Sequence, residues 1–101
     1  MFNELDRLYE CAELFELLTY YATLGKEDRT TWHDRLQEFA GMKERDLTRM
    51  YGELIAHGWL EQNTGLTPIL EPGRHAACYR VTSAGLKIYK QVTKALRTAA
   101  G

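Results

Sequence analysis

The feature that most constrains the fold is the stretch at residues 41–60, GMKERDLTRMYGELIAHGWL. If this stretch is helical, four apolar side chains recur every three or four residues and share one face: Leu47, Met50, Tyr51 and Leu54. That spacing predicts an amphipathic helix packed against a core. Gly41 stands just before the helix and Gly58 just after it, where a glycine often ends a helix in the left-handed conformation.

The opposite face of the same predicted helix has an unusual composition. It carries two long cations, Arg45 and Arg49, in line with two small residues, Gly52 and Ala56. The small residues would let a second surface come close, while the arginines would attract an anion. The pattern therefore predicts a helix presented outward to an anionic partner. The alternative is a solvated face with surface ion pairs.

The distribution of charge along the chain is more informative than its total. The formal net charge of -1 argues against a broadly basic nucleic-acid binder. Residues 1–28 contain seven acids and two bases, residues 29–60 five of each, and residues 61–101 two acids and six bases. If the helices at the two ends lie side by side, within a subunit or across a dimer, these charges attract. Otherwise the asymmetry only solubilises two exposed faces.

Length and composition indicate a single domain covering residues 1–101, with 45% hydrophobic and 27% charged residues. No apolar run approaches the ~20 residues that span a membrane. The first residues do not resemble a signal peptide, so a cytoplasmic location without membrane association is expected. Cys11 and Cys78 are expected to be buried free thiols, with redox sensing left open.

The sequence offers no pattern typical of an enzyme. His33, His57 and His75 are scattered, so no metal or cofactor is expected. Acids such as Glu13 and Glu16 lie along a predicted helix without a nucleophile turn or a phosphate-binding loop. The chain is therefore expected not to be an enzyme.

Long amphipathic helices are predicted at both ends of the chain. Residues 3–24 have an apolar surface wider than one stripe, which a small domain rarely covers by itself. Residues 83–98 form a last helix, capped by Thr82 or Ser83, with lysines and an arginine opposite its apolar face. We expect part of the first helix, around Leu8, Tyr9, Cys11 and Phe15, to meet a second copy of the chain.

A short second helix and a hairpin are predicted between these ends. The helix would begin at Thr31, which stands three residues before Asp34 as in a capping arrangement. Its inward residues would be Trp32, Leu36, Phe39 and Ala40. The hairpin would cover residues 59–82, with glycines and prolines in its loop. On its returning strand, alternation gives an inward set, Ala77, Tyr79 and Val81, and an outward set, Cys78 and Arg80.

Three helices, a hairpin and a last helix, in this order, form a winged helix-turn-helix with an added C-terminal helix. Residues 41–60 resemble the recognition segment of MarR-type regulators through their GM turn, LTR core and GWL end. Residues 73–85, GRHAACYRVTSAG, are similar to the wing of PadR-type regulators. The expected fold is thus mainly α with a small β hairpin. Its predicted parts are dimerisation helices at 1–24 and 83–98, a helix-turn-helix at 31–58 and a wing hairpin at 59–82.

The resemblance implies a homodimeric transcription factor, of bacterial or viral type, with two recognition helices in successive major grooves of double-stranded DNA. It also implies that the helices at both ends form the dimer, so that Tyr89, Val92 and Leu96 of the last helix join Leu8, Cys11 and Phe15 in the interface. Carried over position by position, six residues would contact DNA: Lys43, Arg45, Thr48 and Arg49 from the helix, and Arg74 and His75 from the wing. Two features depart from the family pattern. Ala76 and Ala77 replace the usual basic residues of the wing. Glu44 and Asp46 would oppose phosphate, unless Glu44 accepts from a cytosine amino group.

The leading hypothesis is therefore sequence-specific DNA binding by a homodimeric repressor. A winged helix can instead serve as a protein-interaction module without DNA binding, and the balanced charge of residues 29–60 would suit that role. A plasmid or phage replication or partition protein would use the same surface. Nothing in the sequence identifies a small-molecule effector.

Overall fold

The structure, a computed structural model, describes residues 4–36, 38–63 and 78–100. In chain order its elements are α1 (Glu4–Glu10), α2 (Ala12–Glu27), β1 (His33–Asp34), α3 (Glu44–Ala56), β2 (Leu60–Asn63), β3 (Cys78–Val81) and α4 (Ser83–Ala100). The described chain is mainly helical with a small antiparallel sheet, which confirms the predicted fold class at this level. Among its helices, none is both long and apolar enough to cross a bilayer.

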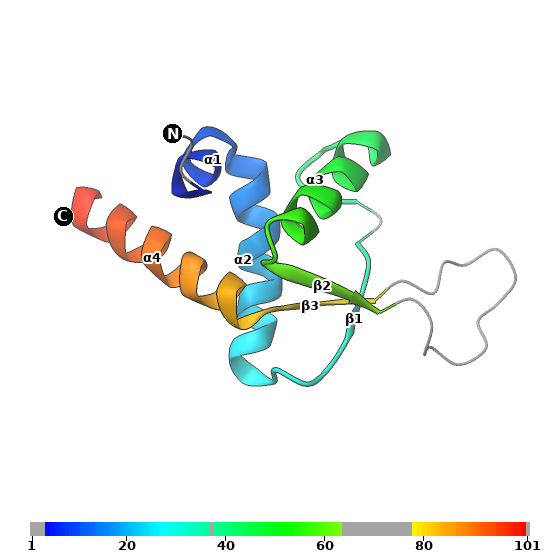
Figure 1. Ribbon diagram of the computed structural model, residues 1–101. Coiled ribbons are helices and arrows are strands. Elements are labelled where there is room, and N and C mark those ends of the chain that lie inside the picture. Colours follow the sequence, from blue (N-terminus) through cyan, green and yellow to red (C-terminus); the bar gives the residue numbers. More distant parts are fainter. Residues whose placement is uncertain (1–3, 37, 64–77, 101) are drawn as a thin grey trace, which may run out of the picture.

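Helix α2 lies at the centre of the molecule. Figure 1 shows α4 on one side of α2 and α3 on the other, and α1 packs against both α2 and α4. The strands form one antiparallel sheet in the order β1-β3-β2, and β3 contacts α2. Leu60 pairs with Val81 and Asn63 with Cys78, which fixes the register of the β2–β3 hairpin.

The hydrophobic core forms where α2 meets α3, α4 and the sheet. Three leucines of α2 are fully buried: Leu14, Leu17 and Leu18. The other elements bury these residues against them: Leu47, Tyr51, Leu54, Trp59, Leu60, Tyr79, Val81, Leu86, Ile88 and Val92. The predicted inward face of α3 is therefore confirmed, as are Tyr79 and Val81 on β3, while Ala77 lies outside the described residues. Met50 also packs against this core, half-buried.

The helix predicted at residues 3–24 is interrupted. Cys11 has an extended backbone (φ −124°, ψ 96°) between α1 and α2. Neither proline nor glycine stands at this point in the sequence, so tertiary packing causes the bend. The bend places Leu8 in the core and lets Arg7 reach Glu53 on α3. These contacts offset the backbone hydrogen bonds that a continuous helix would make.

The predicted second helix is absent from the described part of residues 28–43. The Thr31 hydroxyl donates to the Asp28 carboxylate instead of capping a helix, and Asp28 also accepts from the amide and hydroxyl of Thr30. These hydrogen bonds from Thr30 and Thr31 hold the pKa of Asp28 well below its usual range. The chain then forms β1, which pairs with β3. The helix prediction was wrong because pairing with β3 satisfies backbone groups of this segment that helical hydrogen bonds would otherwise satisfy.

A chain of hydrogen bonds, here called the tyrosine relay, holds this connecting segment against α2 and α3. The Leu36 amide donates to the Tyr51 hydroxyl at 2.8 Å, and the Tyr21 hydroxyl donates to the Asp34 carbonyl at 3.0 Å. The two hydroxyl oxygens lie 2.7 Å apart. Because Tyr21 gives its only proton to Asp34, Tyr51 must be the donor between the two hydroxyls. Burial raises the pKa of both tyrosines, which keeps the relay protonated.

The last helix begins as predicted. The Thr82 hydroxyl accepts from the Gly85 amide at 2.9 Å, and the Thr82 carbonyl accepts from the Leu86 amide at 3.0 Å. The same hydroxyl donates to the Gly58 carbonyl at 2.6 Å, which ties the start of α4 to the end of α3. The helix continues to Ala100, slightly past its predicted end.

An ion pair joins α1 to α3 across the bend. The Arg7 guanidinium donates to Glu53 twice, with Nε–Oε2 at 2.5 Å and Nη2–Oε1 at 2.9 Å. Arg7 is the main reason that the pKa of Glu53 lies below its usual range, and His57, 3.5 Å away, acts in the same direction. Both side chains of the bidentate pair are partly exposed, 30% for Arg7 and 22% for Glu53, so water weakens the interaction.

We expect Glu53→Gln to lower the free energy of unfolding by about 1 kcal/mol at neutral pH, because Arg7 loses its charged partner. The pKa of Glu53 is lower in the folded than in the unfolded chain. The pair's contribution is therefore complete above the unfolded pKa of about 4.3 and is lost as the pH falls through the folded pKa. Denaturant unfolding of variant and wild type, compared at neutral pH and at a pH of about 2.5, measures the change.

Glu16→Gln is the matched control, because Glu16 is exposed and has no partner among the described residues. It should change stability by less than about 0.5 kcal/mol at both pH values. A cost of Glu53→Gln that did not change with pH would contradict the assignment.

Candidate nucleic-acid interface

The side of α3 that faces away from the core is exposed. We call it the α3 face, and its residues are Arg45, Thr48, Arg49, Gly52 and Ala56. Glu44 and Asp46 lie in the first turn, where acids suit the positive end of the helix dipole and favour a helix start. Lys43 precedes the helix with an extended backbone and is also exposed. The structure thus presents outward all four helix residues predicted to contact DNA.

The cations at this face are not neutralised by the described part of the chain. The side chains of Lys43, Arg45 and Arg49 form no ion pair or hydrogen bond with another described residue, whereas those of Arg7 and Arg80 are each paired with a glutamate. An unpaired arginine keeps its whole fork of N–H donors for an external acceptor. The α3 face is therefore positively charged and accessible.

Gly52 occupies the middle of the α3 face with open space in front of it. A Cβ built on Gly52 would have no atom within 4 Å, and its backbone φ is not positive. Glycine inside a helix costs about 1 kcal/mol relative to alanine. The described contacts give no reason within the subunit for a glycine here. A close approach by another molecule would give one.

A tight turn leads into α3. The Met42 amide donates to the Phe39 carbonyl at 2.9 Å, and the two residues between them, Ala40 and Gly41, have φ values of 54° and 72°. Two positive φ values at the centre are those of a type I′ turn. The turn predicted at Gly41 is therefore present, but it follows an extended segment and not a helix. Ala40, predicted to face inward, is exposed because it lies at the tip of this turn.

Arg35, which the sequence did not single out, also lies at the α3 face. Its Nη2 donates to Thr48 Oγ1 at 2.7 Å, and its Nη1 donates to the Leu36 carbonyl at 3.2 Å. Its guanidinium carbon lies 5.1 Å from the centre of the Tyr51 ring. No sequence signal indicates these contacts, because they depend on the extended path of the segment where a helix was predicted.

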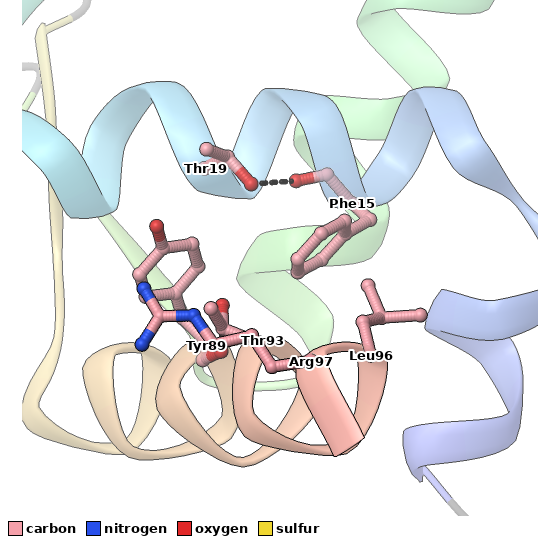
Figure 2. Close-up of a pocket in the computed structure, with 6 residues that line it drawn as sticks. All are labelled: Phe15, Thr19, Tyr89, Thr93, Leu96 and Arg97. Carbon is pink, nitrogen blue, oxygen red and sulfur yellow. Dashed lines mark hydrogen bonds between the residues drawn. The ribbon is translucent and has the colours of Figure 1, made fainter. Parts of the chain in front are cut away.

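A groove of about 340 Å³ lies between α2 and α4, on the other side of α2 from the α3 face. Six residues line it: Phe15, Thr19, Tyr89, Thr93, Leu96 and Arg97. Figure 2 shows the ring of Phe15 directed from α2 toward α4, and this ring stacks with that of Tyr89 at a centroid distance of 6.0 Å. The lining is mostly apolar, and Leu96 at its edge is 46% exposed.

The six predicted dimer-interface residues differ in exposure. Leu8 and Val92 are buried in their own chain. The other four retain accessible surface: Cys11, Phe15, Tyr89 and Leu96. A second copy of the chain could therefore meet only these four directly, and three of them line the groove.

Opposite charges lie on the two helices that form the groove. The exposed acids of α2 include Glu13 and Glu16. The exposed cations of α4 are Lys87, Lys90, Lys94 and Arg97. The charge asymmetry expected from the sequence is thus present on neighbouring helices, because α2 and α4 pack together.

The remaining candidate residues contribute little to a site. Arg74 and His75, the predicted wing contacts, lie outside the described residues. Cys11 and Cys78 form no disulfide, and both are half-buried, whereas the sequence predicted buried thiols. In the described ranges, no group of three or more His, Cys, Asp or Glu residues could hold a metal ion.

Comparisons of the chain with protein-family models, with curated proteins and with solved structures found no match. The case for a function therefore depends on the α3 face and its surroundings. The α3 face has three features that a function must explain: its unpaired cations, the open space in front of Gly52, and its exposure.

Proposed function

We propose that this protein binds double-stranded DNA as a homodimer, with α3 as the recognition helix of a winged helix-turn-helix, and that it acts as a transcriptional repressor in the cytoplasm. The observation that carries the proposal is the outward pair Arg45 and Arg49, which has no described partner and lies beside the open Gly52. A surface that only needed solubility would not require a helix-destabilising glycine beside its cations.

The dimensions of α3 suit a major groove. Its 13 residues give a length of about 20 Å, and the groove of B-DNA, about 12 Å wide, admits an α-helix. Arg45 and Arg49 are one turn apart and could reach a guanine edge or a phosphate. The small residues Gly52 and Ala56 would let the helix backbone approach the duplex closely.

The acids of the first turn have separate roles in this proposal. Asp46 is half-buried and supports the start of the helix through the dipole. Glu44 lies in the same turn and is exposed. It would accept from a cytosine amino group, which would make it a residue that selects sequence.

A second copy of the chain is the proposed occupant of the groove between α2 and α4. Tyr9 and Leu96 are exposed large hydrophobic residues, 48% and 46% exposed, and both belong to the helices at the ends of the chain. In a two-fold dimer, the acids of one subunit's α2 could meet the cations of the other subunit's α4. Charge complementarity and apolar exposure thus favour the same surface.

Arg45→Ala and Arg49→Ala are each expected to weaken duplex binding about tenfold, because each removes a charge-assisted contact. Each should also reduce the salt dependence of binding by about one released counterion. The experiment is a fluorescence-anisotropy titration of a labelled duplex across several salt concentrations, after solution sizing, which is expected to give a dimer. Arg29→Ala is the control, since Arg29 is an exposed cation that bonds Ser83, away from the α3 face. Unchanged binding by the folded double variant would refute the proposal.

The second candidate is a winged-helix interaction module that binds protein. It is favoured by the balance of five acids and five bases over residues 29–60. It predicts no binding to duplex DNA even at low salt, where non-specific electrostatic attraction is strongest. A replication or partition role would use the α3 face in the same way and differ in what the bound protein recruits.

A further inference from the structure

The hydroxyl of Thr48 behaves differently from every other threonine in the described helices. Four helical threonines donate to the carbonyl four residues earlier: Thr19, Thr23, Thr93 and Thr98. This return bond is a common arrangement for a helical threonine. Thr48 lacks it, and its oxygen accepts from Arg35 at 2.7 Å instead. The Thr48 hydroxyl is therefore bonded to Arg35 and not to its own helix.

The contact leaves the Thr48 proton without an acceptor among the described residues. A hydroxyl has one proton and two lone pairs, and a guanidinium can only donate. Arg35 thus occupies a lone pair of Thr48 and cannot take its proton. No acceptor in the described part of the chain takes it either. Thr48 is consequently a donor at the centre of an exposed helix face.

Arg35 is held in place by the tyrosine relay. Leu36, whose carbonyl accepts from Arg35, gives its amide proton to Tyr51, and the Tyr51 ring lies under the guanidinium. These contacts use some of the five N–H donors of the Arg35 guanidinium, and the others remain available to donate to another acceptor. No described carboxylate forms an ion pair with Arg35. Its positive charge therefore remains beside the Thr48 hydroxyl.

We propose that Arg35 and Thr48 together bind one phosphate of the DNA backbone. The inference rests on the proposed function and adds to it a contact from outside α3. A pre-positioned guanidinium and a hydroxyl donor are the groups that proteins commonly use for phosphate oxygens, and phosphate accepts from both at once. The connecting segment, held extended by β1 and the relay, thereby fixes the register of α3 on the duplex.

The test uses the full chain and a labelled duplex of random sequence, about 30 base pairs long, titrated from low to moderate salt. Arg35→Gln should weaken binding about tenfold and reduce the slope of log K against log salt by about 0.9. Thr48→Val should weaken binding several-fold with an unchanged slope, because it removes a donor but no charge. Thr48→Ser should bind like the wild type, since it keeps the hydroxyl. The double variant Arg35→Gln/Thr48→Val should lose less than the product of the two single losses.

Two control variants isolate the effect. Arg29→Gln makes the same charge change nearby in the chain, but Arg29 bonds Ser83. Thr23→Val makes the same side-chain change at a threonine that returns its proton to Thr19. Both should bind like the wild type. Thermal unfolding of every variant separates loss of contact from loss of fold, and the Thr48 pair keeps the test valid if Arg35→Gln unfolds.

The outcomes distinguish this inference from the proposed function. Normal binding by folded Arg35→Gln and Thr48→Val, with weak binding by Arg45→Ala, would overturn the phosphate contact alone. A loss that varied strongly with duplex sequence would show a base contact and would also overturn it. No duplex binding by the wild type at low salt would overturn both.

Discussion

Replacing Gly85 with alanine is expected to lower the free energy of unfolding by about 3 kcal/mol, the largest loss that we predict for a single added methyl group. A Cβ at Gly85 would lie 2.1 Å from the Trp59 carbonyl oxygen and 2.8 Å from Val81 Cγ2. The first of these is a backbone atom and cannot rotate away. The first turn of α4 would have to move from the segment that links α3 to β2. Urea denaturation of the two proteins measures the loss.

Gly52→Ala is the matched control, and its effect should have the opposite sign. Both residues are helical glycines, but a Cβ at Gly52 meets nothing within 4 Å. Alanine has the higher helix propensity, so this variant should gain about 0.5–1 kcal/mol. A loss below about 1 kcal/mol for Gly85→Ala would mean that α4 can shift easily, which would contradict the close contact with Trp59.

Tyr51→Phe is expected to cost about 2 kcal/mol although it removes only one oxygen atom. The tyrosine relay then loses its middle member. The Leu36 amide is left without its acceptor, and the Tyr21 hydroxyl is left without its donor. Losing partners for polar groups in a buried site costs about 1–3 kcal/mol, more than the bond itself contributes. Urea unfolding measures the cost, with circular dichroism to check that helix content is kept.

The neighbouring Tyr20 offers a control for the chemistry of the change. It is 36% exposed, and its hydroxyl makes no hydrogen bond with the described residues. Tyr20→Phe should therefore change stability by less than about 0.5 kcal/mol. If both variants cost the same, the relay would not contribute to stability in the way described.

Helix α3 was predictable because its signals are local. The spacing of Leu47, Tyr51 and Leu54 requires only that the segment be helical, and the structure buries all three. Gly58 has φ +78°, as its place after the helix predicted. The outward cations follow from the same periodicity, since the face opposite a buried stripe is exposed. This part of the candidate site could therefore be identified from residue spacing alone.

The bend at Cys11 and the strand β1 could not be predicted, because distant residues determine them. Arg7 and Glu53 are 46 positions apart, and no local pattern indicates that they meet. The hydroxyl of Thr31 had two competing uses, a helix cap and a turn with Asp28, and the pairing of β1 with β3 decided between them. Local preference is a weak guide where tertiary contacts compete with it.

The candidate site shows the same division between local and long-range information. The resemblance to MarR-type regulators predicted that Thr48 faces outward, and the structure exposes it. Its partner Arg35 was expected inside a helix and instead reaches across from an extended segment. An inference about which side chains share a face is thus more secure than one about which side chains share a hydrogen bond.

The interruption at Cys11 has a consequence for how the ends of the molecule are coupled. In a continuous helix the backbone hydrogen bonds would fix the direction of α1 relative to α2. Here the angle between α1 and α2 depends on side-chain contacts. Leu8 and Arg7 hold that angle, and the acceptor of Arg7 is Glu53 on α3. The orientation of α1 therefore depends on the position of α3. If either helix tilted, the Arg7–Glu53 contact would move the other helix, while α2 between them stayed unchanged.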